Sequence, residues 1–198
     1  MNPSIACVAF EGGRCIASGE LREVALKVYE AIQNRQASIL MFDAATSELI
    51  DVDFRGSVRD VKRWLDYQPP AGGPEPAVDE KRPPGRPKLG VVAREVTLLP
   101  RHWEWLNLQP GGASVALRKL VEDARRVNRH SDRVRRAKEA AYRFLSAVAG
   151  NEAGFEEATR ALFSGNEIAF AKHILNWPPD VREHAARLAA RVFEDGPE

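Results

Sequence analysis

Hydrophobic residues near the start of the chain follow strand and helix patterns in alternation. An apolar run from Ile5 to Phe10 ends at Gly12-Gly13, and this favours a β-hairpin because glycine adopts positive φ without a Cβ clash. Ser57-Val-Arg-Asp60 matches a capping box, a common start of a helix. The pattern predicts strands at 5–10 and 15–17, a helix at 21–32, strands at 38–42 and 49–54, and a helix ending near residue 65. Residues 1–67 are therefore expected to form a ββαββα module.

A proline-rich segment separates this module from the rest of the chain. Residues 68–90 hold seven of the 13 prolines, which lack an amide donor and fix φ, so a packed helix or central strand is excluded there. Further on, the pattern predicts a strand at 91–99 and helices at 101–108, 114–129, 131–149, 156–163, 167–176 and 181–193. We expect an α+β chain in four parts: the module 1–67, a basic linker 68–90, a segment 91–130 and a helical tail 131–198.

The composition narrows the class of protein. Of 198 residues, 44% are hydrophobic and 29% charged, which is typical of globular proteins. No apolar run approaches the length that spans a bilayer, and no secretory signal is visible at the start. Two cysteines are too few for a disulfide scaffold or a four-cysteine zinc site. The expected location is therefore the cytoplasm.

Charge is distributed unevenly along the chain. The formal net charge of +1 conceals net charges of −5 over residues 1–80, +10 over 81–143 and −4 over 144–198. A basic middle favours a polyanionic partner such as nucleic acid. The alternative is intramolecular, with the acidic flanks neutralising the basic centre.

Lys81-Arg-Pro-Pro-Gly-Arg-Pro-Lys88 resembles an AT-hook, whose centre is Gly-Arg-Pro. The resemblance implies that Arg86 enters a narrow A·T-rich minor groove, where negative potential is concentrated, with Arg82 and Lys88 as basic neighbours. The chain departs from the pattern at Pro84, where the family has arginine. The alternative is a proline-rich basic linker with no groove contact.

The segment 91–130 resembles a ribbon-helix-helix domain. Val96-Thr-Leu-Leu-Pro100 matches its short strand, and Arg101-His-Trp-Glu-Trp-Leu106 matches its first helix. Gly111-Gly112 matches the turn, and Ser114 begins the second helix. The resemblance implies a homodimer, since one strand and two small helices bury too little surface to fold alone. Two paired strands would enter the DNA major groove.

The same resemblance implies which residues contact DNA. Helix amides hold a phosphate at the start of the second helix, which assigns Ser114 and Arg118 to that role and Arg94 to the ribbon. Side chains alternate along a strand, so Val96 and Leu98 would share the groove face with Arg94. These apolar side chains form no hydrogen bonds to base edges. The alternative function is therefore an antitoxin-like protein-interaction or dimerisation module without direct DNA reading.

Motifs of enzymes are largely missing from the sequence. Asp43, Asp51 and Asp53 could converge on a cation, but surface hairpins often carry aspartates. The four histidines lack zinc-ligand spacing, and no phosphate-binding loop, nucleophile elbow or dinucleotide fingerprint occurs. We expect no catalytic residue, no metal and no cofactor, and a protein that is not an enzyme.

The whole chain also resembles an uncharacterised bacterial family. The stretches that carry this resemblance are Phe10-Glu-Gly12, Ile16-Ala-Ser-Gly19, Phe42-Asp43 and the region from Gly85 to Leu106. The sequence as a whole predicts a DNA-binding homodimer of the bacterial nucleoid, acting in transcriptional regulation or nucleoid organisation. The N-terminal module or the C-terminal helices are expected to hold any protein partner, and no membrane is expected as a partner.

Overall fold

The chain divides into two compact units. The computed structural model describes residues 6–34, 38–66, 92 and 94–194, which contain three strands and eight helices. Unit 1 comprises residues 1–68 together with 130–198, and unit 2 comprises residues 69–129. In sequence, unit 2 is thus an insertion between the two halves of unit 1.

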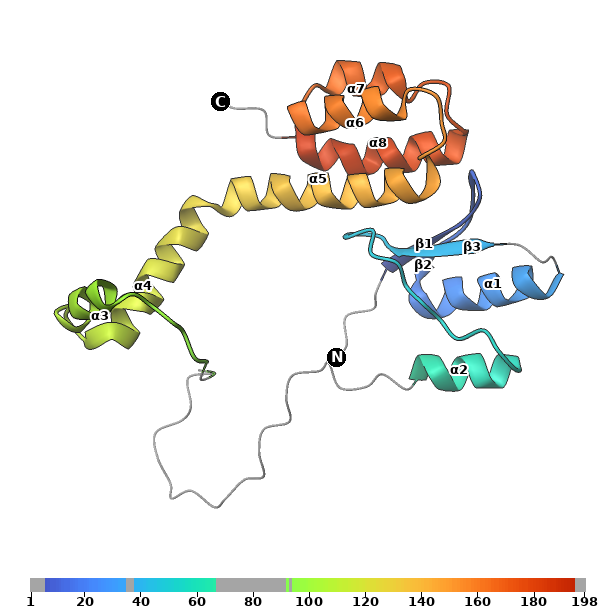
Figure 1. Ribbon diagram of the computed structural model, residues 1–198. Coiled ribbons are helices and arrows are strands. Elements are labelled where there is room, and N and C mark those ends of the chain that lie inside the picture. The colour runs from blue at the N-terminus through green and yellow to red at the C-terminus, as the bar shows by residue number, and fades with distance from the viewer. Residues whose placement is uncertain (1–5, 35–37, 67–91, 93, 195–198) are drawn as a thin grey trace. The chain divides into compact units, whose positions relative to one another are not determined.

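Unit 1 contains a three-stranded antiparallel sheet with β1 at its centre, in the order β2-β1-β3 (Figure 1). Gly12, between β1 and β2, has a φ of 54°, the left-handed conformation that this tight turn requires. The predicted β-hairpin is therefore present. The strands are β1 (Ala6–Glu11), β2 (Arg14–Glu20) and β3 (Ile39–Asp43).

The strand predicted at 49–54 does not form. An isolated bridge joins Leu49 to β3, and no strand follows. Ile50, Val52 and Phe54 nevertheless pack into one hydrophobic core. The alternation in this segment thus reflects one-sided burial of an extended chain without a hydrogen-bonded ladder. The first part of the chain has the order ββαβα in place of the expected ββαββα.

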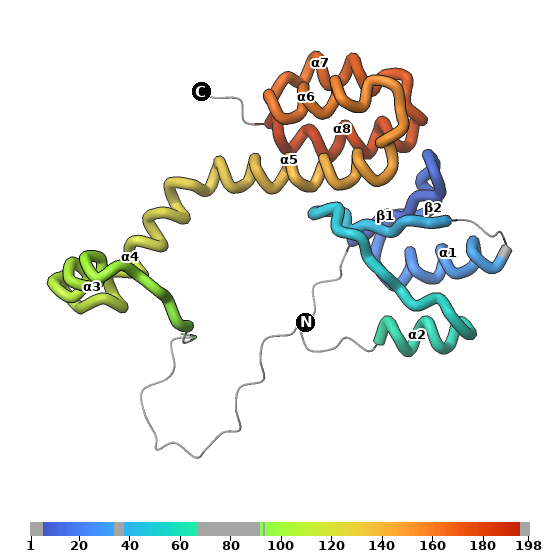
Figure 2. Tube along the Cα trace, in the orientation of Figure 1, coloured from blue at the N-terminus to red at the C-terminus, as the bar shows by residue number. Residues whose placement is uncertain are grey.

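Helices cover both faces of the sheet, as Figure 2 shows. One face packs on α1 and α2, and the other packs on the helices that follow residue 129. The helices of unit 1 are α1 (Leu21–Asn34), α2 (Val58–Asp66), α5 (Arg129–Val148), α6 (Phe155–Ser164), α7 (Glu167–His173) and α8 (Pro179–Phe193).

The central strand β1 is buried on both faces. Cys7 and Ala9 belong to the core under α1 and α2, whereas Val8 and Phe10 belong to the core under α5–α8. Successive side chains of a strand point to opposite faces of the sheet. A strand that is covered by helices on both faces therefore needs a continuous apolar run, and the sequence has one at this position. The core under α5–α8 contains residues from both 1–67 and 131–198. The sequence predicts these two ranges as separate parts of the chain.

An aromatic cluster forms the centre of this shared core. The ring centroid of Phe144 on α5 lies 5.1 Å from that of Phe10 and 5.6 Å from that of Phe42. His184 on α8 lies 4.5 Å from Phe144 in an edge-on arrangement. Such edge-to-face pairs add stability beyond the area they bury.

The hairpin turn contacts the start of α8. The amide of Cys15 donates a hydrogen bond of 2.8 Å to Oδ2 of Asp180. A Cβ atom at Gly13 would lie 2.9 Å from Cγ of Pro178, so glycine is needed there for close approach. Residues 165 positions apart in sequence are thereby joined.

Unit 2 consists, in its described residues, of the helices α3 (Pro100–Asn107) and α4 (Gly112–Val127). Each helix predicted from the sequence has a counterpart that begins and ends within three residues of the prediction. The strand predicted at 91–99 is not observed, because residues 92 and 94–99 form no strand. A strand requires a neighbour to take its hydrogen bonds, and no described segment of the chain pairs with this one.

Candidate nucleic-acid interface

The two helices of unit 2 share a very small interior. Pro100 occupies the first turn of α3, where the missing amide costs no hydrogen bond. Gly111, with a φ of 86°, precedes α4 and allows the sharp change of direction. Among the described residues of unit 2, only Leu106 and Ala116 are buried.

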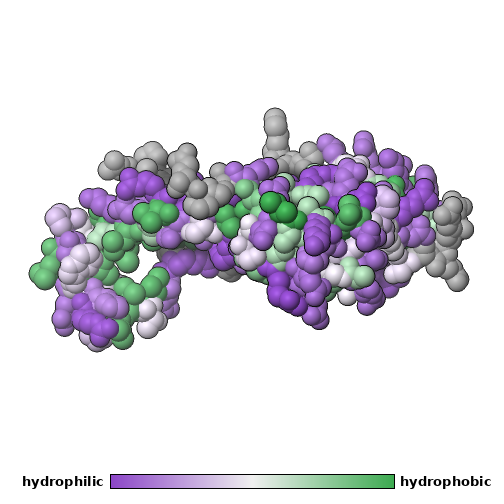
Figure 3. Space-filling view, turned by 90° about the horizontal axis from the view of Figure 1, so that it is seen from above, coloured by the Kyte–Doolittle hydropathy of each residue, from purple (hydrophilic) through white to green (hydrophobic). Residues whose placement is uncertain are grey.

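Large apolar side chains are correspondingly exposed on unit 2, where Figure 3 shows hydrophobic residues open at the surface. Trp105 is 50% exposed and Leu120 is 48% exposed. Both line a hollow of about 340 Å³ that also includes Leu98, Leu106 and Leu117. Leu98 therefore faces the helices while Leu99 is exposed, the reverse of the expected strand register.

The two residues expected to hold a phosphate lie together at the start of α4. Nε of Arg118 donates to the carbonyl of Ser114 at 3.0 Å, and Nη2 lies 3.5 Å from its hydroxyl oxygen. No described side chain caps the helix, and its first turn has no acidic residue. The first amides of α4 and these two side chains therefore offer donors on one exposed helix end.

Of the other residues expected to contact DNA, one lies in the described part of the chain. Arg94 is exposed, and no hydrogen bond or ion pair joins its side chain to another described residue. Arg82, Arg86 and Lys88 lie outside the described residues. The structure therefore brings together Ser114 and Arg118 of the predicted set.

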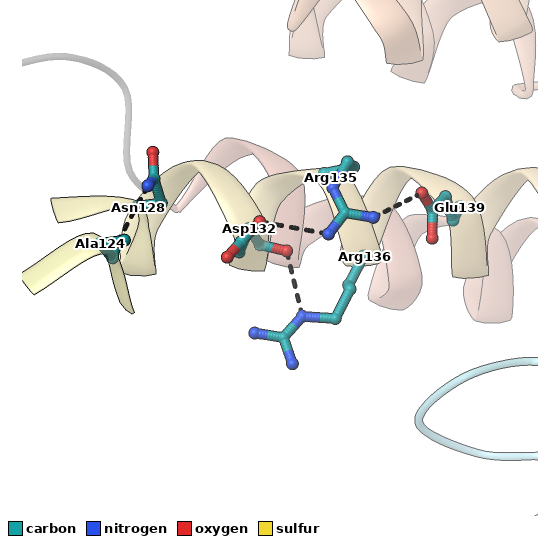
Figure 4. A network of polar contacts seen from close by, with 6 residues as sticks. All are labelled: Ala124, Asn128, Asp132, Arg135, Arg136 and Glu139. Atoms are coloured by element: carbon teal, nitrogen blue, oxygen red, sulfur yellow. Dashed lines mark hydrogen bonds and ion pairs between the residues drawn. The ribbon is translucent and has the colours of Figure 1, made fainter. Parts of the chain in front are cut away.

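Many basic side chains have acidic partners on their own helix. On α4, Arg125 pairs with Glu122 at 2.8 Å, three residues before it. On α5, Arg135 lies between Asp132 and Glu139, at 3.1 Å from each (Figure 4). Exposed pairs of this kind contribute about 1 kcal/mol or less, so their arginines can exchange a carboxylate for a phosphate.

A second pair of basic residues, far apart in the sequence, meets at one turn of unit 1. Arg143 of α5 and Arg191 of α8 each donate a hydrogen bond to a backbone carbonyl in the turn 43–48. These contacts span 97 and 146 positions of sequence. Local spacing gives no signal for such a pair, and Arg191 lies in the acidic C-terminal block.

Two of the three aspartates considered for a cation, Asp43 and Asp53, bond to residues close by in sequence. Oδ1 of Asp43 accepts hydrogen bonds from the amides of Ala45 and Thr46. Asp53 binds Arg55 through both carboxylate oxygens, and these hydrogen bonds lower the pKa of Asp53 to about 2. Within the described ranges, no group of three or more histidine, cysteine or acidic side chains could hold a metal ion.

The cysteines have the properties of core thiols. Burial, followed by the nearby charge of Asp43, raises the pKa of Cys7 to about 11. Burial also raises the pKa of Cys15 above its ordinary value, with Asp180 as the next cause. Both thiols are thereby held in the protonated, weakly nucleophilic form.

The fold defines a mixed α+β protein, mostly helical, with a two-helix unit inserted in sequence into a sheet-and-helix unit. Among the described helices, none has the length and apolar character needed to cross a membrane. The chain belongs to the family described as "Uncharacterized protein conserved in bacteria (DUF2239)", whose model matches residues 6–189. Comparisons with curated proteins and with solved structures find no match.

This match confirms the expected membership of an uncharacterised bacterial family. The ribbon-helix-helix and AT-hook resemblances find no support in the comparisons.

Proposed function

We propose that the protein is a non-enzymatic DNA-binding homodimer that acts through unit 2 in transcriptional regulation or nucleoid organisation. One observation carries the proposal: the described part of unit 2 leaves most of its apolar side chains exposed on helices that also carry basic residues. The apolar surface supports a second copy as a partner, and the basic residues support a polyanion.

The small interior of unit 2 supports dimerisation. Two short helices with two buried residues remove too little apolar surface from water to offset the entropy of ordering the chain. A second copy would cover Trp105 and Leu120, and would supply the missing neighbour for the extended residues 94–99. This arrangement is the one that the ribbon-helix-helix resemblance implies.

Charge and donors on α4 support phosphate contact. Residues 94–129 carry a net charge of +3. The bond from Arg118 to Ser114 holds the guanidinium beside the first turn of the helix, where the amides attract an anion. Arg86, flanked by Arg82 and Lys88, adds a minor-groove contact in this proposal.

The test is a titration of A·T-rich and G·C-rich duplexes at two salt concentrations, with oligomeric state measured by light scattering. Arg118→Ala should weaken binding to both duplexes and reduce the slope of log K against log salt by about 2, because a dimer loses two phosphate contacts. Arg86→Ala should remove any preference for A·T. Leu120→Glu should yield a monomer with weak DNA binding.

Two control variants on unit 1 separate these effects from loss of folding. Arg160→Ala on α6 removes an exposed arginine that pairs with two glutamates, and should leave DNA affinity unchanged. Ile168→Glu on α7 changes an exposed apolar residue and should leave the dimer intact. A folded protein that binds no duplex at low salt would overturn the proposal.

A protein-interaction role is the second candidate, and the 340 Å³ hollow on unit 2 favours it. Leu117 and Leu120 give this hollow an apolar floor that an amphipathic segment of another protein would fit. A folded monomer that does not bind DNA in the same titration would support the protein-interaction role over the DNA-binding role.

A further inference from the structure

We propose that unit 1 binds an organic phosphate in a hollow beside the turn 43–48, named here the arginine pocket. The hollow has a volume of about 550 Å³, within the range of small-molecule sites, and its lining contains five arginines and three glutamates. It lies within unit 1, so the proposal does not depend on DNA binding by unit 2.

The turn that borders the pocket is held by its own hydrogen bonds. Oδ1 of Asp43 accepts from the amides of Ala45 and Thr46 at 2.8 and 2.7 Å. The amide of Asp43 donates to the carbonyl of Glu48 at 2.9 Å, which closes the turn. The carbonyl groups of the turn are therefore fixed in direction.

Two arginines, one on α5 and one on α8, donate hydrogen bonds to those carbonyl groups. Nη1 of Arg143 donates to the carbonyl of Thr46 at 2.8 Å, and Nη1 of Arg191 donates to that of Ala45 at 3.2 Å. Arg136 is held similarly, since its Nε donates to the carbonyl of Asp132 at 3.1 Å and its guanidinium extends away from the helix (Figure 4).

These three guanidiniums keep most of their hydrogen-bond donors unused. Each has five N–H groups, of which the anchoring bond uses one. Among the described residues, none of the three forms an ion pair, in contrast to Arg135, which binds two carboxylates. Fixed positive groups with spare donors match the oxygens of a phosphate and lose little entropy when they bind it.

A neighbouring hollow indicates that the phosphate belongs to an organic molecule. This apolar pocket, of about 470 Å³, shares Glu48 and Arg143 with the arginine pocket. Leu49 and Tyr142, both exposed, lie in its lining. A ligand whose phosphates contact the arginines can therefore place an apolar or aromatic group on these two side chains, which gives the class of a nucleotide or another phosphate ester of similar size.

The test is calorimetric titration of the full chain with ADP and, separately, with inorganic pyrophosphate. ADP should bind with a stoichiometry of one per chain and more tightly than pyrophosphate, since only ADP reaches the apolar pocket. Arg136→Gln and Arg143→Gln should each weaken ADP binding about tenfold or more. Leu49→Gln should weaken ADP and leave pyrophosphate unchanged.

Controls keep the result interpretable. Arg160→Gln on α6 removes an exposed arginine outside the pocket and should leave both affinities unchanged. The side chain of Arg136 bonds to its own helix, whereas that of Arg143 bonds to the turn. Arg136→Gln therefore tests the pocket even if Arg143→Gln perturbs the turn. The proposal is overturned if neither probe binds, or if Arg160→Gln weakens binding as much as the pocket variants. It is also overturned if a DNA duplex displaces ADP with the same dependence on Arg136, which would assign the arginines to a DNA backbone.

Discussion

His184 is a titratable side chain inside an aromatic cluster. The residue is 5% exposed, and its Nε2 has no hydrogen-bond partner among the described residues. Burial, followed by the charges of Arg187 and Arg191, lowers the pKa of His184 to about 4, against 6.5 in the unfolded chain. Between these two values the unfolded chain binds a proton that the folded protein excludes, so the free energy of unfolding falls as the pH falls from 6.5 towards 4.

Replacing His184 should therefore flatten the pH dependence of stability. The wild-type protein is expected to lose up to about 3 kcal/mol through this residue across that window, at about 1.4 kcal/mol per pKa unit. His184→Phe keeps a ring beside Phe144 and cannot be protonated. Urea unfolding at pH 7, 5.5 and 4.5 measures the effect, with the exposed His102→Gln as a control that should retain the wild-type slope. An unchanged slope in His184→Phe would contradict the assignment.

At this scale the sequence predicts contacts between near neighbours and misses distant ones. The ribbon-helix-helix resemblance assigns Ser114 and Arg118 to one site, and these two residues, four positions apart on a helix, lie together. Asp43 and Asp53 were considered for a shared cation, yet each bonds to residues two or three positions away. Arg191 reaches a carbonyl 146 positions earlier, and no local pattern encodes that contact.

At the scale of the elements, the turn 43–48 is held by its own hydrogen bonds and also contains a residue with a strained backbone conformation. Ser47 has a φ of 53°, a left-handed conformation that costs an L-residue about 1–2 kcal/mol. The side chain is 2% exposed, and its hydroxyl has no partner among the described residues, which adds a cost of about 1–3 kcal/mol.

Ser47→Gly should raise the free energy of unfolding by about 1 kcal/mol, because the relief of strain and of the buried hydroxyl exceeds the added entropy of glycine in the unfolded chain. Ser47→Ala removes only the hydroxyl and should give a smaller gain. Thermal unfolding of the two variants measures the difference. A loss of stability in Ser47→Gly would show that packing of the serine side chain outweighs both costs.

Helices were predicted more accurately than strands for a physical reason. A helix satisfies its hydrogen bonds within one segment, so caps and apolar spacing such as those around Ser57 and Pro179 define it locally. A strand depends on a partner. The segments 49–54 and 91–99 have strand-like sequences, but the described chain provides no full ladder for either.

In the whole molecule, the shared core makes the two halves of unit 1 mutually dependent. Phe144→Ala should cost about 3–5 kcal/mol, since it removes a fully buried ring between β1, β3 and α8. Hydrogen exchange measured by mass spectrometry should show peptides of β1 and of α5 losing protection together. Leu106→Ala, in unit 2, is the matched control and should leave both peptides protected. Retained protection of β1 in Phe144→Ala would show that the sheet folds without the helices.

This dependence could not be predicted from the sequence. The apolar run at β1 indicated a strand, but the identity of the layer that covers Phe10 depends on contacts with residues more than 100 positions later. The same holds for Gly13, whose missing side chain makes room for Pro178. The sequence pattern predicts each helix of the tail separately. Only the packing in the structure shows that the apolar faces of these helices contact the sheet.

The shared core also determines when the protein can fold during its synthesis. Phe10 and Phe42 leave the ribosome early, whereas Phe144 and α8 follow only after all of unit 2 has been made. At about 5–20 residues per second, the nascent chain carries an uncovered aromatic sheet surface for roughly 5–30 s. Unit 2 is complete before that surface is covered. Chains that stop short of α5 therefore keep an apolar face open to water, and exposed apolar surface of this kind promotes aggregation and binding by chaperones.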